Sequence, residues 1–246
     1  LLLLLTRDDG RAEAWVSYRD YALAAGLLAD LALADCLGFE DRKRDPKVWL
    51  TGELAAERVG GPSAAPRPDS GTGEAAGPAA VMDFGIRALA ARSKPPRVQA
   101  LIPAGWFNPR EVVSRSLVAQ GVVTLEEARF LGLKPERYPA VDERPEMHTR
   151  GRLREALGGR GEVSASDAMI VGILRGMDSA KVILKEEAAA EGLKGRALNK
   201  RIEQITDELP ALAQHSGRAL SASIAAIGAA IGAAIAASAA VSAGSS

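Results

Sequence analysis

The chain has little of the material from which catalytic and metal-binding sites are built. Among its 246 residues are one cysteine, Cys36, and two histidines, His148 and His215. One cysteine excludes an intrachain disulfide framework, which agrees with a reducing compartment. Two histidines leave almost no material for a zinc site or a Ser/His/Asp triad. Cys36 stands in the apolar run LADLALADCL, where a small core residue is expected rather than a nucleophile.

The chain also lacks an excess of charge of either sign. Its 31 Lys and Arg residues balance its 31 Asp and Glu residues. A chain without net charge has no overall field that would attract nucleic acid or a membrane. An anionic partner therefore has to be held by a local cluster of basic residues, and we expect no nucleic-acid partner.

Long hydrophobic runs are scarce, and the two that stand out do not predict a membrane span. LLLLL, residues 1–5, has no basic flank and is followed closely by DDG, so it predicts a buried strand entering a turn rather than a secretory signal. Residues 219–240 are uncharged and include the GxxxG pattern of membrane helix pairs. Their isoleucines recur at helical spacing among Ala, Ser and Gly, which favours a C-terminal helix packed in the core over a transmembrane helix.

Helical periodicity, by contrast, covers most of the chain. Residues 15–37 are rich in Ala and Leu and apolar nearly all round, which predicts a central core helix. Asn108, Pro109 and Gly121 suit the N-cap, first turn and C-cap of a second helix. The remaining expected helical segments are 81–93, 97–102, 144–159, SDAMIVGILRGM after a cap at Ser164 or Ser166, and one or two helices over 181–208.

Two predicted β-hairpins and one insertion interrupt the helices. Segments 37–40 and 47–51 flank the polar turn DRKRDP, and RFLGL and RYPAV flank KPE. Residues 58–80 are rich in Gly, Pro, Ser and Ala without periodicity, and predict a flexible surface insertion. The expected fold is mainly α: a single globular domain over residues 1–246, with a central apolar helix core, surrounding amphipathic helices and one or two short β-hairpins.

The order of these segments resembles the Golgi phosphoprotein 3 family, most closely its bacterial, largely actinobacterial members. The resemblance covers nearly the whole chain and rests on LLLLL, YALAAGLLADLAL, REVVSRSLVAQGVVT, FLGLKPERYPAVD, RGRLREALGG and DAMIVGILRGMDSAKVI. It implies a mostly helical peripheral membrane adaptor at the cytoplasmic face of a membrane. Such adaptors bind phosphatidylinositol 4-phosphate and gather the cytoplasmic tails of glycosyltransferases, and the resemblance implies no cofactor.

The resemblance also places four headgroup-binding positions on this chain. They fall on Trp15, Ala24, Phe107 and Arg110. The tryptophan and one arginine of the family pattern are therefore present, whereas two arginines are replaced. Arg110 stands in the first turn of its predicted helix, where free amides and the helix dipole favour an anion and a guanidinium can add a bidentate contact. We expect an anionic phospholipid or phosphoinositide headgroup as the partner.

Arg19 and Arg115 complete the predicted headgroup site. Arg19 follows Trp15 by four residues and shares its helix face, whereas Arg115 points away from Arg110 by more than a right angle. The alternative interpretation is a partly buried tryptophan with solvated arginines. The arginines at positions 150, 152 and 154 are expected to form a solvated helix face.

The second hairpin carries a group of predicted surface contacts. The resemblance implies that this hairpin contacts another subunit and lies on the membrane-facing side, so a homo-oligomer is among the expected partners. A self-contained structural hairpin is the alternative, because exposed apolar edges must be covered by something. The residues concerned are Phe130, Leu131, Leu133 and Tyr138.

An enzyme remains an alternative to the adaptor. Acidic residues in turns offer paired carboxylates or a magnesium site, although Asp is common in turns for backbone reasons alone. These residues are Asp8, Asp9, Glu13, Glu40, Asp41 and Asp45. SGTGE lacks the GK[ST] ending and the preceding strand of a phosphate loop. We predict an adaptor and not an enzyme; a soluble interaction scaffold that has lost lipid binding and an unrecognised enzyme are the alternatives.

Overall fold

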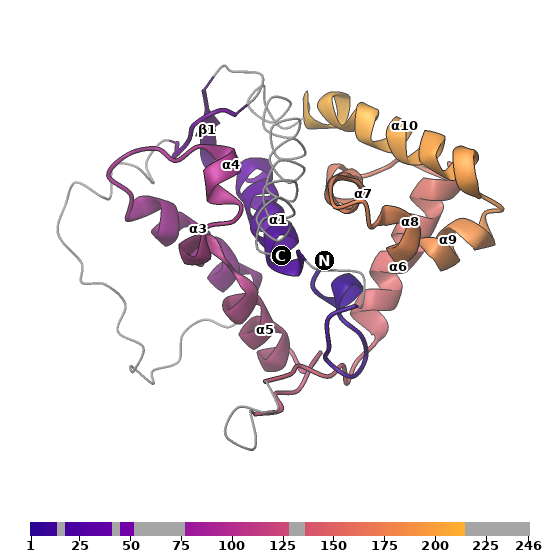
Figure 1. Cartoon of the computed structure of the whole chain (residues 1–246), viewed down its shortest axis with the longest axis horizontal. Helices are drawn as coiled ribbons and strands as arrows, with labels where there is room; N and C mark the ends of the chain where they lie inside the picture. The colour runs from indigo at the N-terminus through magenta and orange to yellow at the C-terminus, as the bar shows by residue number, and fades with distance from the viewer. Residues whose placement is uncertain (14–17, 41–44, 52–76, 128–135, 215–246) are drawn as a thin grey trace, which may run out of the picture.

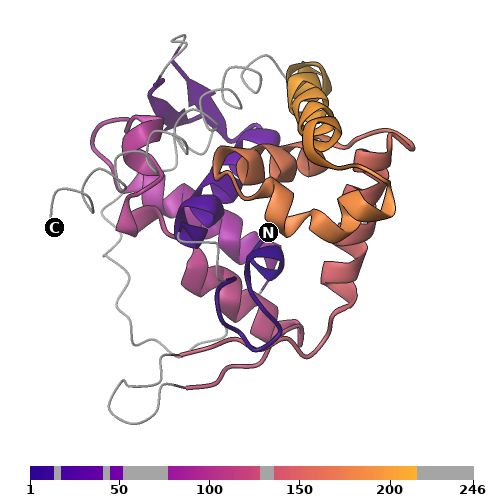
Figure 2. The ribbon, with the colours of Figure 1, turned by 45° about the vertical axis from the view of Figure 1, so that its right-hand side comes forward.

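The described part of the chain is mainly helical, with one two-stranded antiparallel sheet, as predicted. The computed structural model describes residues 1–13, 18–40, 45–51, 77–127 and 136–214. Figures 1 and 2 show the helices gathered around α1. In chain order the elements are η1 Leu3–Leu5, α1 Arg19–Leu33, β1 Leu37–Phe39, β2 Val48–Leu50, α3 Pro78–Ala90, α4 Val98–Leu101, η3 Gly105–Phe107, α5 Arg110–Ala119, α6 Arg144–Gly158, α7 Ala165–Gly176, α8 Ala180–Ile183, α9 Lys185–Ala190 and α10 Gly195–Gln214.

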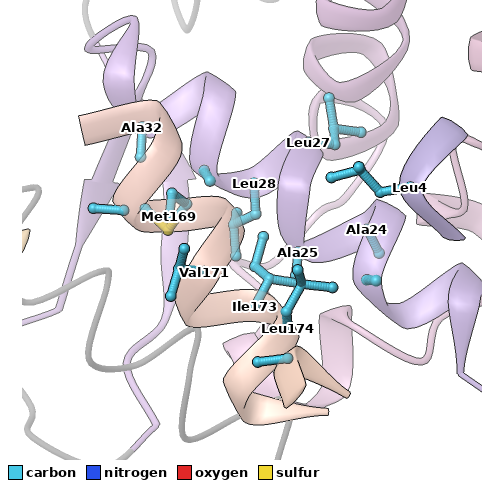
Figure 3. Close-up of a cluster of buried hydrophobic side chains, with 14 of the residues drawn as sticks. Leu4, Ala24, Ala25, Leu27, Leu28, Ala32, Met169, Val171, Ile173 and Leu174 are labelled. Carbon is cyan, nitrogen blue, oxygen red and sulfur yellow. The ribbon is translucent and has the colours of Figure 1, made fainter. Parts of the chain in front are cut away.

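Helix α1 is the centre of the hydrophobic core, which confirms the predicted central helix. Its leucines and alanines are buried on nearly every side, and α3 and α7 both contact it. Figure 3 shows Ala25 and Leu28 of α1 beside Ile173 and Leu174 of α7. Each fully buried leucine contributes roughly 1.5–3 kcal/mol relative to an exposed one. The helix begins at Arg19 and ends four residues before the predicted end at residue 37.

The N-terminal leucines form a turn of 3-10 helix, so the predicted strand was wrong. Leu4 and Leu5 are at most 1% exposed and belong to the same core cluster as α1. The Leu5 N–H donates to the Leu2 carbonyl at 3.1 Å, which closes the backbone bonds locally. A strand would need a neighbouring strand for these groups. The burial that the apolar run predicted is nevertheless present.

The first predicted hairpin forms regular strands, whereas the predicted leg RFLGL of the second hairpin lies outside the described residues and RYPAV pairs instead with residues 122–126. β1 and β2 pair in the register Leu37↔Leu50. In the second hairpin, isolated bridges join Val123 to Ala140 and Glu126 to Arg137. Its tip, 128–135, lies outside the described residues, as do most of the predicted insertion 58–80 and the predicted C-terminal helix 219–240. The last residues assigned to the insertion instead begin α3.

The predicted caps are confirmed at α7 and after α5, whereas the predicted N-cap Asn108 lies one residue too early, because the N-cap position of α5 is Pro109. Ser164, not Ser166, caps α7, because its Oγ accepts a hydrogen bond from the Asp167 N–H at 3.0 Å. Gly121 follows α5 with a φ of +69°, a conformation that glycine adopts without strain. The stretch predicted as one or two helices over 181–208 contains α8, α9 and α10. Within the described ranges, the membrane-span criteria of length and apolarity are met by no helix.

The arginines of α6 join neighbouring helices, so their interpretation as a solvated face was wrong. The Arg150 guanidinium donates to Glu187 of α9 at 2.9 Å, and Arg152 pairs with Asp167 of α7 at 3.0 Å. The side chains of both acids are only 6% exposed. Arg154 pairs with an acid just beyond α9 in the same way. Glu187 and Asp167 therefore have their positive partners on α6, whereas the acid beyond α9 also pairs with Arg160, which follows α6.

Two helix-interior glycines provide a test of the α1–α3 contact. A Cβ added at Gly85 of α3 would lie 2.8 Å from Leu31 Cδ1 and 2.9 Å from Leu27 Cδ1, whereas one at Gly151 of α6 would meet nothing within 4 Å. We predict that Gly85→Ala lowers the free energy of unfolding by roughly 1–3 kcal/mol through overpacking. Gly151→Ala should raise it by roughly 0.5–1 kcal/mol through helix propensity. Urea denaturation measures both, and equal shifts would contradict the close approach of α3.

The ion pair between α6 and α9 is tested by removing its arginine. The second carboxylate oxygen of Glu187 is buried without a partner among the described residues, so Arg150 supplies its compensating charge. Arg150→Met should lower the free energy of unfolding by roughly 2 kcal/mol, because the buried acid loses that charge. Arg144→Met is the matched control, since Arg144 is 88% exposed in its pair with Asp142. A similar loss in both variants would show that the buried α6–α9 pair contributes no more to the free energy of unfolding than the exposed pair of Arg144 with Asp142.

Candidate anion-binding site

Two of the predicted headgroup residues, Arg19 and Arg110, come together in one surface pocket. Arg19 is the first residue of α1 and Arg110 the first residue of α5. The pocket is closed by Thr6 from the N-terminal segment, Ser114 from the second turn of α5 and Tyr138 from the second hairpin. Figures 1 and 2 both show the N-terminal segment beside α5 and the hairpin legs. Residues far apart in the sequence thus meet because α1 and α5 begin close together.

Within the described ranges, neither of the two arginines forms an ion pair with a carboxylate. Arg19 is half-buried, and its Nη1 donates to the Thr6 hydroxyl at 3.2 Å. Burial lowers the pKa of Arg19, the positive charge of Arg110 lowers it further, and the Asp20 carboxylate acts in the opposite sense. The guanidinium of Arg110 makes no hydrogen bond or ion pair with another described residue. Leu2, Leu3 and Val123 also line the pocket, so the two guanidinium groups stand beside apolar side chains.

The acids nearest the pocket are bonded to groups other than these two arginines. Their partners are an amide, a phenol and an arginine that does not line the pocket. The pairs are Asp20 with the Asn108 amide at 3.1 Å, Glu136 with the Tyr138 hydroxyl, and Glu111 with Arg115. A hydrogen bond from an amide or a phenol leaves a carboxylate its negative charge, and Asp20 still favours the charged form of Arg19. Among the described residues that line the pocket, the charged ones are Arg19 and Arg110, and no acid is among them.

The volume of the pocket limits what can enter it. It measures about 20 Å³, which is room for about one water molecule. Pockets that enclose a whole small molecule measure about 300–1,000 Å³. The site therefore cannot surround a sugar ring, but an oxygen of a phosphoryl group at its mouth can reach the guanidinium groups. This geometry suits a phosphoryl group that is attached to a larger molecule, most of which stays outside the pocket.

The other predicted site residues have different outcomes. Arg115 does not line the pocket and is exposed in its pair with Glu111. Ala24 and Phe107 are both fully buried, and Figure 3 places Ala24 among the core side chains, so neither can touch a headgroup. Tyr138, predicted as a membrane or subunit contact, lines the anion pocket. Four further predicted residues lie outside the described ranges: Trp15, Phe130, Leu131 and Leu133.

Sequence reasoning missed Thr6, Ser114 and Asp20 as parts of this site. A hydroxyl in a turn and a serine inside a helix carry no signal for anion binding. Asp20 is separated from its partner Asn108 by 88 positions, and no local pattern links residues at that distance. Asn108 was predicted as a helix cap, and its Oδ1 does accept a hydrogen bond from the Arg110 N–H at 3.0 Å.

The carboxylates considered for catalysis perform local structural tasks. Asp45 Oδ1 accepts a hydrogen bond from the Gln99 N–H at 3.0 Å, and Glu40 Oε2 accepts one from the Lys47 N–H at 3.4 Å. Asp9 and Glu13 pair with arginines of the N-terminal turn. Asp41 lies outside the described residues. In the described part of the chain, no group of three or more His, Cys, Asp or Glu residues could hold a metal ion.

A second hollow is larger but does not favour one sign of charge. It has a volume of about 260 Å³ and lies where the end of α7, α8 and α10 meet. Arg175 and Lys181 line it together with Asp178 and Glu203. Arg175 is already engaged with Glu203 at 3.6 Å and with a threonine of α10. The smaller pocket is therefore the better candidate for an anion, since neither of its arginines is paired with a carboxylate in the described part of the chain.

Fold and pocket together define a class: a mainly helical protein whose N-terminal segment, two helix starts and a hairpin enclose a small basic pocket. The family model for Golgi phosphoprotein 3 (GPP34) matches residues 1–237. The chain therefore belongs to the Golgi phosphoprotein 3 family, as its order of segments predicted. A comparison with curated proteins found no match. The bacterial, actinobacterial-type subgroup stays a prediction.

The tyrosine of the pocket has a testable titration. Burial, the hydrogen bond to Glu136 and nearby negative charge raise the pKa of Tyr138 to about 12. Since the unfolded phenol loses its proton near pH 10, the folded protein keeps a proton that the unfolded chain has lost, and stability should fall between pH 10 and about 12. We predict that the absorbance difference between wild type and Tyr138→Phe shows Tyr138 becoming a phenolate only near pH 12. Circular dichroism monitors folding in the same samples, and a midpoint near pH 10 in folded protein would contradict the assignment.

Proposed function

We propose that this chain is a peripheral membrane adaptor that binds anionic, phosphoinositide-like lipid headgroups through Arg19 and Arg110 at the cytoplasmic face of a membrane. One observation carries the proposal: two arginines without a carboxylate partner among the described residues converge on one pocket. Like charges held together repel each other, and an anion between them removes that repulsion. Family membership is consistent with an adaptor-like role rather than catalysis.

The chemistry of the pocket supports a phosphate-bearing ligand. Guanidinium groups bind phosphate through paired, charge-assisted hydrogen bonds. Arg110 stands in the first turn of the ten-residue helix α5, where the helix dipole adds a positive potential. The Tyr138 hydroxyl is protonated at neutral pH, as an ordinary phenol is, and its pKa of about 12 keeps it so well into the alkaline range; it therefore adds no negative charge to the site. The small volume means that the phosphoryl group enters while the rest of the lipid stays outside.

Apolar surface beside the pocket supports contact with a membrane. The bridges of the second hairpin place Leu125 opposite Tyr138, and Leu125 is 42% exposed. Val141, at the end of the same pairing, is 61% exposed. The hairpin legs therefore present apolar side chains next to a site for a charged headgroup, as a lipid surface requires. We propose that the predicted contact residues of this hairpin touch the membrane or a second copy of the chain.

A soluble interaction scaffold is the second candidate function. It is favoured by the burial of Ala24 and Phe107, because two of the four family positions for the headgroup are apolar and inaccessible. Such a protein would bind protein tails without binding lipid. The two candidates differ in a single property, which is the attraction of the purified chain to anionic vesicles.

Vesicle flotation with arginine variants tests the proposal. The vesicles are phosphatidylcholine alone, and phosphatidylcholine with equal surface charge from phosphatidylserine or from phosphatidylinositol 4-phosphate. Arg110→Ala should weaken binding to the anionic vesicles roughly tenfold, because it removes a charge-assisted contact. Arg115→Ala removes the same charge five residues further along α5, outside the pocket, and should leave binding unchanged.

The outcome separates the candidates. Stronger binding to the phosphoinositide vesicles than to the phosphatidylserine vesicles would show that the pocket selects the phosphoinositide headgroup. Equal binding would show that the chain binds anionic membranes without selecting a headgroup. Equal losses in the two variants would assign the attraction to net charge instead of to the pocket. Wild-type protein that binds neutral and anionic vesicles equally weakly would overturn the lipid function and leave the scaffold.

A further inference from the structure

The two site arginines are carried by helix starts that one amide side chain joins. Asn108 Nδ2 donates to Asp20 Oδ2 at 3.1 Å, and Asn108 Oδ1 accepts from the Arg110 N–H at 3.0 Å. Asp20 directly follows Arg19 at the start of α1. The same amide therefore contacts the neighbour of one arginine and the backbone of the other. This is a direct side-chain connection between the two ends that form the pocket.

A connection of this kind answers a physical need of the pocket. Arg19 and Arg110 carry the same charge, and the charge of Arg110 disfavours the protonated form of Arg19. Without an anion they repel, so the empty pocket is held together by other interactions. A hydrogen bond to a carboxylate is among the stronger ones, and this bond is partly buried. Outer contacts that hold a binding side chain in place commonly decide the affinity of the site.

We propose that Asn108 is a positioning residue of the anion site, which holds Arg19 and Arg110 at one pocket through its hydrogen bonds to Asp20 and to the α5 backbone. The inference rests on the proposed function and adds to it a residue that touches no ligand. It differs from a simple helix cap, since a cap requires the acceptor oxygen of Asn108 alone. The donor nitrogen, which reaches α1, is the atom that the inference assigns to the site.

Four variants separate the two halves of the amide. Asn108→Asp keeps an acceptor for the Arg110 N–H but loses the donor and faces the Asp20 carboxylate. Asp20→Asn with Asn108→Asp reverses the bond, because the new amide at position 20 donates to the new carboxylate at 108. Asp20→Ala with Asn108→Asp has the same net charge as that swap but no donor. Asp20→Asn alone keeps an acceptor for the Asn108 amide.

Binding to the phosphatidylinositol 4-phosphate vesicles described above is the readout, and thermal unfolding of each variant shows that it is folded. Asn108→Asp should weaken binding roughly tenfold. The swap should recover most of this loss, Asp20→Ala with Asn108→Asp should not, and Asp20→Asn alone should bind at least as well as wild type. Rescue by a restored hydrogen bond at constant charge is a result that a charge effect alone does not produce.

Three further outcomes would contradict the positioning role of Asn108, each for a different reason. Equal recovery in the two double variants would show that charge alone acts, and would overturn the positioning role. Wild-type binding that Asn108→Asp leaves unchanged would overturn the positioning role while the proposed function stands. Wild-type protein without preference for the anionic vesicles would overturn the proposed function and this inference together.

Discussion

The burial of α1 is the constraint on which the rest of the structure depends. This helix has apolar side chains on nearly every face, so neighbouring elements must surround it to remove that surface from water. Helix α7 packs against one side, as Figure 3 shows, and α3 approaches another side closely at Gly85. The N-terminal leucines fill the same cluster. The middle of α1 is apolar and buried, whereas its first turn carries the charged residues Arg19 and Asp20. This turn lies at the surface, where Asp20 accepts a hydrogen bond from Asn108 just before α5.

Arginine has two different roles in this protein, and its partners distinguish them. The arginines of α6 reach buried carboxylates on α7 and beside α9, where their removal would leave negative charges unpaired in the interior. Arg19 and Arg110 face each other across a pocket whose nearby acids are bonded elsewhere. The first group contributes to the fold, whereas the second has no carboxylate partner among the described residues and is the group that we propose for a ligand. Neither role is visible from the number of arginines or from their spacing.

The pocket departs from the pattern that the family resemblance placed on this chain. The position nine residues after Trp15 is Ala24, which faces the core, and Phe107 is likewise fully buried. Arg19, five residues before Ala24, supplies the positive charge of α1 instead. A pocket of about 20 Å³ with two guanidinium groups can hold an oxyanion but cannot enclose a headgroup. This arrangement supports affinity for anionic surfaces more directly than selection of one phosphoinositide.

The sequence by itself determined the elements whose signals are local. Apolar periodicity predicted α1, the turn between 37 and 51 predicted the first hairpin, and a cap at Ser164 or Ser166 predicted the start of α7, because caps and periodicity act within a few residues. For the N-terminal leucines the sequence predicted burial but not backbone conformation, since a short apolar run suits either a strand or a helical turn. It also identified Arg19 and Arg110 as candidates, though it included Arg115 with equal weight.

Tertiary structure alone decided which of these residues meet. Asp20 and Asn108 are 88 positions apart, and their hydrogen bond exists because α1 and α5 pack with their starts together. The same packing separates Arg115 from the pocket and turns the α6 arginines toward buried acids. A local pattern can state what a residue is able to bind. Only the arrangement of the helices determines whether a carboxylate lies beside an arginine. The presence of such a carboxylate distinguishes the structural arginines of α6 from Arg19 and Arg110, which we propose for a ligand.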